Sequence, residues 1–200
     1  MCIRDRSFPA NAPFTHAEPW LGAELDTQHH VEELVMRYLG AFGPATVRDM
    51  QTWCGLPNLK EAFEALRPGL QVYRNEKKRE LFDLPGLEIP DAASEAPARF
   101  LPEFDNLLLS HQDRRRVVPD AVRKGVYLPA LRVAATFLLD GIVAGSWRVA
   151  VTKSAAELLL TPFREVAPRE RDALAAEGES MLEFIESQAS SRSIRFADVP

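Results

Sequence analysis

The sequence predicts an α+β fold in which a mainly helical first half precedes a β-rich second half. Three observations predict this order. Apolar residues recur at helical spacing between residues 31 and 42. Two strand-like runs flank a polar turn near residue 75, and two longer apolar runs flank Asp140-Gly141, a strong hairpin signal. We therefore expect three helices and a β-hairpin, followed by a small β-barrel-like lobe with a covering C-terminal helix.

The first long helix is expected from an apolar stripe with the period of one helix face. The residues of the stripe are Val31, Leu34, Val35, Tyr38, Leu39 and Phe42. Asp26 or Thr27 is expected to cap its start, and Gly43-Pro44 is expected to end it.

Two shorter helices and a hairpin are expected next. Thr46 and Asp49 have the spacing of a capping box, and Gly55 suits the position after the second helix. Asn58 is expected to cap a third helix that buries Leu59, Phe63 and Leu66. Strand-like runs on both sides of residues 75–78 are expected to form a hairpin, which completes a predicted domain at residues 26–84. Three short helices followed by a hairpin is the order of a winged helix.

The second half begins after a linker at residues 85–97, which is rich in Pro and Ala. In the lobe at residues 98–200, strands are expected on both sides of Asp140-Gly141, at AELLLTPF and at SIRFADV. A long helix is expected to begin at Pro168. Its expected inner face is Leu174, Gly178, Met181, Leu182 and Ile185.

Composition limits the classes of function. The chain is 46% hydrophobic and 26% charged, which is typical of a soluble globular protein, and no apolar run is long enough to cross a bilayer. Cys2 and Cys54 are the only cysteines and the histidines are scattered, so we expect no metal site, no cofactor and a cytoplasmic location.

The opening MCIRDR has no apolar core or cleavage site, so it is not a signal peptide. It looks like the scar that heads gene models truncated during sequence assembly; the alternative is a genuine disordered start. Residues 1–25 are accordingly expected to be a scar followed by a remnant or linker, and the chain the C-terminal part of a longer protein.

Charge is distributed unevenly, although the net charge is −5. Residues 74–79 carry four positive charges and one negative, and residues 111–124 carry five and two. The expected last helix, residues 168–188, carries six acidic residues and two arginines. A protein that presents basic loops to phosphate has this kind of polarity.

These basic loops supply the candidate DNA-binding residues. They are Arg74, Lys77, Lys78, Arg79, His111, Arg114, Arg115 and Arg116. The alternative is that these side chains are only solvated, or that the arginines pair with Asp105, Asp113 or the acidic helix. The third helix is neutral, since Lys60 and Arg67 are balanced by Glu61 and Glu64. It is therefore a poor candidate for reading bases, and recognition of backbone and shape is expected instead.

For several other polar residues, a structural role is the stronger interpretation. Glu103, Asp105, His111 and Asp113 could form an acid–base cluster, but capping of turns or pairing with arginine is the stronger interpretation. Ser110-His111 suggests a nucleophile and base, yet adjacent residues seldom meet in catalytic geometry. Trp53 and Trp147 are expected in the core, and His29-His30, at a helix start, are expected to be solvated or capping.

Three segments resemble a known family: YLGAFGPATVRDMQTWCGL (38–56), LPEFDNLLLSHQDR (101–114) and LLDGIVAGSWR (138–148). Together they are similar to the winged helix DNA-binding domain family, which includes the AlkZ-like DNA glycosylases that unhook interstrand crosslinks. The resemblance covers residues 27–197. It implies a tandem winged-helix architecture that ends in a small β-barrel and acts on duplex DNA.

The resemblance also bears on catalysis. Glycosylases of this family carry a glutamine–apolar–glutamine motif in the N-terminal part of the chain. The glutamines here are Gln28, Gln51, Gln71, Gln112 and Gln188, and no two are separated by a single residue. The motif is absent, so whether this chain is an enzyme stays open. The expectation is a DNA-binding module; the alternatives are a glycosylase active in a longer chain and a scaffolding protein that binds no nucleic acid.

Overall fold

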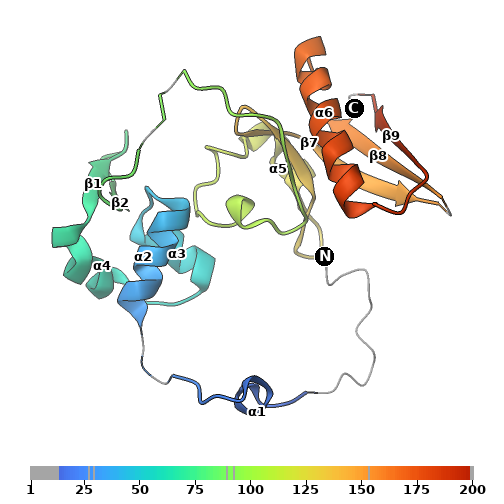
Figure 1. Ribbon diagram of the computed structural model, residues 1–200. Coiled ribbons are helices and arrows are strands. Elements are labelled where there is room, and N and C mark those ends of the chain that lie inside the picture. Colours follow the sequence, from blue (N-terminus) through green and yellow to red (C-terminus); the bar gives the residue numbers. More distant parts are fainter. Residues whose placement is uncertain are drawn as a thin grey trace.

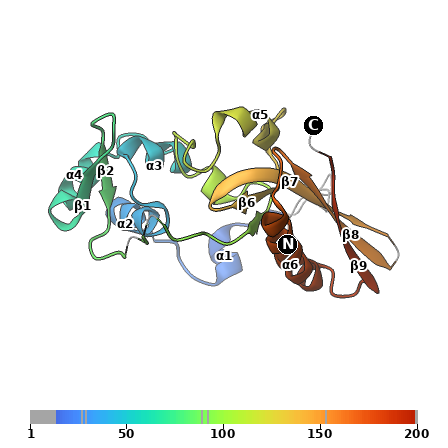
Figure 2. The same cartoon turned by 90° about the horizontal axis from the view of Figure 1, so that it is seen from above.

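The computed structural model describes residues 14–26, 28, 30–88, 90–91, 93–152 and 154–198. The fold is mixed α+β and elongated. Helices α2–α4 and the β1–β2 hairpin lie at one end, and strands β7–β9 with helix α6 lie at the other (Figure 1 and Figure 2). In the described part of the chain, no helix is long and apolar enough to cross a membrane.

The first expected helix is confirmed as α2 (Val31–Phe42), with Val35, Tyr38 and Leu39 buried. Its expected caps are only partly right. Gly43 follows its last turn, but the residue before α2 is His30, and no side chain caps the start. Asp26 instead bonds to His30 and to the backbone of Gln28, while Thr27 lies outside the described residues.

Helix α3 (Val47–Cys54) begins with the expected capping box between Thr46 and Asp49 and ends at Gly55 in the left-handed conformation. Helix α4 (Lys60–Leu66) starts one residue later than expected. Leu59 precedes it, so Asn58 is not its cap. After a 3-10 turn at Arg67–Gly69, strands β1 (Gln71–Arg74) and β2 (Glu80–Asp83) form the expected hairpin.

These elements surround one hydrophobic core that lies within residues 31–84. Phe63 packs edge-on against Phe82 of β2, with ring centroids 5.1 Å apart. Between α2 and α3, Ala45 forms an isolated antiparallel bridge with Phe82. Gly43 is required at this approach, because a Cβ there would collide with the side chain of Asp83 and the carbonyl of Leu39.

The second half contains an open sheet of five strands in the order β3-β6-β7-β8-β9. Their bounds are β3 Arg99–Leu101, β6 Thr136–Leu139, β7 Ile142–Val151, β8 Ala155–Pro162 and β9 Ser191–Phe196. Asp140 and Gly141 both have positive φ in the turn between β6 and β7, as the hairpin signal predicted. Strand β3, which follows the linker, was not expected.

The prediction of a barrel-like lobe is wrong, because β3 and β9 are the edges of the sheet and do not pair with each other. All four residues of β6 are buried because both faces of the sheet are covered. Phe137 packs in the core beneath α6, whereas Leu138 packs in the core formed by residues 101–133. The apolar residues on both faces of β6 therefore reflect two layers that cover the sheet, not closure of the sheet into a barrel.

Helix α6 (Pro168–Ile185) covers one face of the sheet and connects β8 to β9, which pair in parallel (Figure 1). Leu174, Gly178 and Leu182 are buried as expected, but Ile185 is 42% exposed. Gly178 allows close approach to the sheet, since a Cβ there would lie 2.8 Å from the Leu158 side chain.

The other face of the sheet is covered by short elements between β3 and β6. These are the 3-10 turns Asn106–Leu108 and Asp120–Val122, helix α5 (Arg123–Val126), and the strand pair β4 (Tyr127–Leu128) and β5 (Arg132–Val133). This connecting region also reaches back to α2 and α3, as described below. The expected boundaries at residues 84, 97 and 98 stay a prediction.

One helix was missed. Within residues 1–25, expected to be a scar and linker, Ala17–Leu21 forms helix α1, which buries none of its residues. The MCIRDR segment lies outside the described residues. The expected last strand is confirmed as β9, and the strand at AELLLTPF as β8.

Candidate nucleic-acid interface

The first group of candidate residues lies at the hairpin tip, residues 74–79. Asn75 shapes this turn, because its side-chain oxygen accepts hydrogen bonds from the backbone of Lys77 and of Arg79, each at 3.0 Å. Lys78 adopts a positive φ of 58°. Lys77, Lys78 and Arg79 are exposed, and no ion pair joins their side chains to another described residue.

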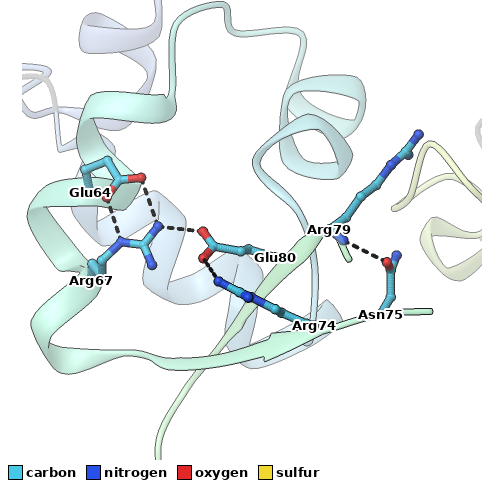
Figure 3. Close-up of polar contacts among 6 residues, drawn as sticks. All are labelled: Glu64, Arg67, Arg74, Asn75, Arg79 and Glu80. Carbon is cyan, nitrogen blue, oxygen red and sulfur yellow. Dashed lines mark hydrogen bonds and ion pairs between the residues drawn. The ribbon is translucent and has the colours of Figure 1, made fainter. Parts of the chain in front are cut away.

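Arg74 differs from its neighbours because it is held by a carboxylate. Glu80 lies between Arg74 and Arg67, at 3.6 Å and 2.8 Å, and Arg67 also binds Glu64 (Figure 3). The Arg79 side chain extends away from this network (Figure 3). Hydrogen bonds from Arg67 lower the pKa of both Glu64 and Glu80. Arg74 is therefore already partly neutralised, whereas the remaining three cations of the tip are available to a ligand.

The second group forms the arginine segment, residues 111–116. Each of its three arginines has a different partner. Arg115 forms a two-pronged ion pair with Asp113, which holds the pKa of that carboxyl well below its usual range. Arg114 is half-buried, donates to the His111 carbonyl at 2.9 Å, and lies 4.9 Å from the ring centroid of Tyr127. These contacts match the alternative in which Asp113 pairs with an arginine.

Arg116 crosses to the helical end of the molecule. Its Nη2 lies 3.3 Å from the Pro44 carbonyl oxygen, to which it donates, and 3.0 Å from Nε2 of His111. No carboxylate among the described residues forms an ion pair with it. Arg116 is exposed, so its guanidinium combines a weak internal anchor with access to solvent.

His111 does not face solvent as a free cation would. Its ring lies between the connecting region and α2, with Nδ1 2.8 Å from Ser110 Oγ and Nε2 3.0 Å from the Phe42 carbonyl oxygen. Burial lowers the pKa of His111, and the charge of Arg116 lowers it further. The ring is therefore neutral at pH 7, and it is not a direct source of positive charge.

Five hydrogen bonds fasten the connecting region to the helical end. We call this contact the seam. It comprises the bonds of His111 and Arg116 described above together with Tyr38 Oη to the Ser110 carbonyl, the Gln112 amide to Asp49 Oδ1, and Trp53 Nε1 to Asn106 Oδ1. The seam fixes the arginine segment relative to the hairpin tip, because both are attached to the same helices.

The seam also brings the two basic groups near each other. The pKa of Asp113 is lowered mainly by its hydrogen bonds from Arg115, and the positive charge of Lys77 at the hairpin tip adds a smaller contribution. The two loops, separated by more than thirty residues in sequence, thus lie within electrostatic reach. A cavity of about 260 Å³ opens in the seam and is lined by His111, Asp113, Arg114 and Arg116.

Asp105 and Asp113 have the structural roles that were the stronger interpretation of the sequence, not those of a catalytic acid–base cluster. Asp105 accepts from the Leu107 backbone at the start of a 3-10 turn, and Asp113 is occupied by Arg115. Ser110 and His111 do meet, contrary to expectation, but Ser110 is fully buried and its hydroxyl cannot reach a substrate. No three metal-ligating side chains gather among the described residues.

Sequence reasoning missed Asp49 and Tyr38 as parts of the seam. The capping box explained one oxygen of Asp49, and nothing in the sequence indicated that the other accepts from Gln112. Tyr38 did carry a signal: a tyrosine on an apolar helix face requires a partner for its hydroxyl when it is buried. The expected packing of Trp53 and Trp147 is confirmed, since Trp53 contacts Tyr38 and Trp147 contacts Phe100.

Comparison with known proteins adds family and fold. The sequence model of the family described as "DNA glycosylase AlkZ-like" matches residues 2–184. The solved structure of Streptomyces sahachiroi DNA glycosylase AlkZ matches with a TM-score of 0.70 and 24% identity. The match covers 84% of this chain and 45% of that one, so the chain spans less than half the length of that protein. No curated protein sequence matches.

Proposed function

The chain belongs to the AlkZ-like DNA glycosylase family, and from this premise we propose that it acts in DNA repair by binding the phosphate backbone of duplex DNA through two basic loops. The binding has little sequence specificity. The hairpin tip supplies Lys77, Lys78 and Arg79, and the arginine segment supplies Arg115 and Arg116.

The observation that carries this proposal is that Lys77, Lys78 and Arg79 are exposed at the hairpin tip and form no ion pair with another described residue. Two separate positive loops held in one orientation can contact the two sides of a phosphate-lined groove, and each contact releases counterions. The acidic helix α6 lies at the opposite end of the molecule (Figure 2). This separation orients the basic end of the chain toward a polyanion and keeps its negative charge away.

We further propose that residues 26–84 are a winged helix whose wing is the β1–β2 hairpin. The order α2, α3, α4, β1 and β2 supports this assignment, as does the isolated bridge between Ala45 and Phe82, which ties the segment between α2 and α3 to β2. In this arrangement α4 is the groove-reading helix. Arg67, which directly follows α4, is engaged by Glu64 and Glu80, which favours backbone recognition over base reading.

Base excision is not part of the proposal for this chain. The glutamine–apolar–glutamine motif is absent from its sequence, and the described carboxylates of the seam are occupied by hydrogen bonds. Purified chain is expected to release no alkylated base from damaged duplex DNA above background. Abasic sites that form with this chain, and that vanish when Asp49, Asp113 or His111 is changed, would contradict this expectation.

A scaffolding role without nucleic acid is the second candidate, and one observation favours it: each arginine of the arginine segment has a partner within the protein. For this reason the three arginines are not a clean test. Removing all three would also remove the packing of Arg114 on Tyr127, so we expect reduced stability together with any reduction in binding.

The hairpin tip gives the sharper test. We expect Lys77→Ala, Lys78→Ala and Arg79→Ala together to weaken binding to unrelated duplexes equally, measured by fluorescence anisotropy. The slope of log affinity against log salt should fall by about 0.9 for each phosphate that the protein no longer neutralises. A control removes the same charge at the other end of the molecule, formed by β7–β9 and α6 and called the sheet end. It combines Arg148→Ala, Arg169→Ala and Arg195→Ala, and it should leave the slope unchanged. Equal effects of both triple variants, or no measurable binding by the parent chain, would favour scaffolding.

A further inference from the structure

The surroundings of His111 present a conflict of hydrogen bonding. Nε2 lies 3.0 Å from an acceptor, the Phe42 carbonyl oxygen, and 3.0 Å from a donor, Nη2 of Arg116. A ring nitrogen of neutral histidine is either a donor or an acceptor. Nε2 can therefore satisfy only one of these two neighbours at a time.

Two neutral arrangements follow. With its proton on Nε2, the ring donates to Phe42 and accepts at Nδ1 from the Ser110 hydroxyl, and Arg116 is left without a bond to the ring. With its proton on Nδ1, the ring donates to Ser110 Oγ and accepts from Arg116 at Nε2. Ser110 then turns its own hydrogen to the Leu107 carbonyl, 3.4 Å away. Only the second arrangement holds Arg116 on the ring.

The protonated ring also finds its hydrogen-bond acceptors at this site, but burial and the nearby guanidinium of Arg116 oppose its charge. An imidazolium carries two N–H donors, and both have acceptors in place, Ser110 Oγ at 2.8 Å and the Phe42 carbonyl at 3.0 Å. What opposes protonation is burial together with the guanidinium of Arg116, which lowers the pKa of His111. Moving Arg116 away would remove the nearest positive charge and leave both donors satisfied.

The other charged and titratable groups around the ring come from each element packed against it. Arg114, in the same segment, disfavours protonation, and Asp49 of α3 favours it. Tyr38 of α2 contributes its hydroxyl to the Ser110 carbonyl and stays neutral, because burial raises its pKa. Asp113 lines the same cavity but is paired with Arg115. Arg116 is thus the only one of these groups that is both exposed and without a carboxylate partner among the described residues.

We propose that His111 and Arg116 form a proton-linked switch: neutral His111 holds Arg116 in the seam, and capture of Arg116 by a DNA phosphodiester is coupled to uptake of one proton by His111. This inference rests on the proposed DNA-binding function and specifies how that site is regulated. His111 is then a positioning residue, which acts on DNA through Arg116.

The linkage has a definite sign. In the free protein, burial and, second, the charge of Arg116 keep the pKa of His111 below its ordinary value, and in the complex the contribution of the departed guanidinium is gone. The pKa is then higher in the complex than in the free protein, so binding takes up a proton between the two values. Affinity for duplex DNA rises as the pH falls through this window, by at most about tenfold per pH unit for one proton.

The binding experiment compares three proteins with one labelled duplex at constant ionic strength between about pH 5.5 and 8, where histidine titrates. The parent chain should bind more tightly at the acid end. His111→Gln, which keeps a side chain able to bond to Phe42 and Ser110, should lose this dependence. His16→Gln removes an exposed histidine near α1 and should keep it. The same pH dependence in the parent and His111→Gln proteins would overturn the switch.

A second measurement needs no DNA. NMR titration of the His111 ring should give a higher pKa in Arg116→Gln than in the parent chain, and the parent value should rise when duplex DNA is added. An unchanged His111 pKa in Arg116→Gln would overturn the switch even if DNA binds. If the parent chain binds no duplex at any pH, the proposed function fails, and the coupling to DNA fails with it. The Arg116→Gln titration would still decide whether ring and guanidinium are coupled.

Discussion

The hydroxyl of Tyr38 donates a buried hydrogen bond of 2.7 Å to the backbone carbonyl of Ser110, which lies 72 residues further along the chain. This bond joins the core of the helical end to the connecting region at the point where the arginine segment begins. Because the donor is a side chain on the buried face of α2, the orientation of the basic loops depends on the packing of that helix.

Tyr38→Phe should therefore destabilise the protein by about 1–2 kcal/mol, since the buried Ser110 carbonyl loses its side-chain donor. Urea denaturation measures this change. Tyr73→Phe is the matched control, because the Tyr73 hydroxyl forms no hydrogen bond with another described residue and its removal should be nearly neutral. Equal stability of the two variants would mean that the bond contributes nothing to the seam.

Asp49 performs two tasks with one carboxylate, and they can be separated. Oδ2 accepts from the Thr46 amide and hydroxyl in the capping box, and Oδ1 accepts from the Gln112 amide. Asp49→Ala should cost about 1–2 kcal/mol and increase hydrogen exchange at the Gln112 amide. Thr46→Val weakens the cap but retains Oδ1, so exchange at Gln112 should stay slow. Slow exchange in both variants would refute the link to Gln112.

Glu80 limits the positive charge of the hairpin because it holds both Arg67 and Arg74. Glu80→Gln should strengthen DNA binding and steepen the salt dependence, by up to about 0.9 if the released Arg74 neutralises one further phosphate. Glu64→Gln removes the same charge but leaves the Arg74–Glu80 pair intact, so its effect should be smaller. Salt titrations that give identical slopes for the two variants would indicate a general charge effect instead.

The stability of the sheet end should depend on pH through Glu170. Hydrogen bonds from Arg164 lower the pKa of Glu170 to about 2, below its ordinary value of 4.5. A lowered pKa in the folded state contributes stability above the ordinary value, and that stability is lost as the pH falls toward 2.

Arg164→Gln should therefore destabilise the protein at pH 7 by about 1 kcal/mol or less, because the pair is partly exposed. The difference should shrink on approach to pH 2, as measured by urea denaturation across this range. Arg169→Gln breaks a more exposed pair with Glu95 and should change stability less. A constant difference between Arg164→Gln and the parent at every pH would contradict the role of Glu170.

Local sequence patterns determined most of the individual elements. The apolar stripe of α2, the capping box at Thr46 and Asp49, and the turn at Asp140-Gly141 depend on interactions between residues that are close in sequence. Such interactions have a fixed spacing, so the pattern predicts the structure directly. The positive charge of the basic loops was also evident, because it follows directly from their residue types.

Tertiary structure alone decided how those elements combine. The apolar strand β6 was consistent with a barrel or with an open sheet, and only the cover provided by α6 and residues 101–133 made it an open sheet. Likewise, the sequence around His111 and the three arginines is compatible both with contact to DNA and with contact to other parts of the protein. Their partners, among them Phe42, Pro44 and Tyr127, come from other segments. The sequence determines whether a side chain can carry a charge. Its burial and its partners depend on residues far along the chain, and burial and partners decide its pKa and whether it is free to bind a ligand.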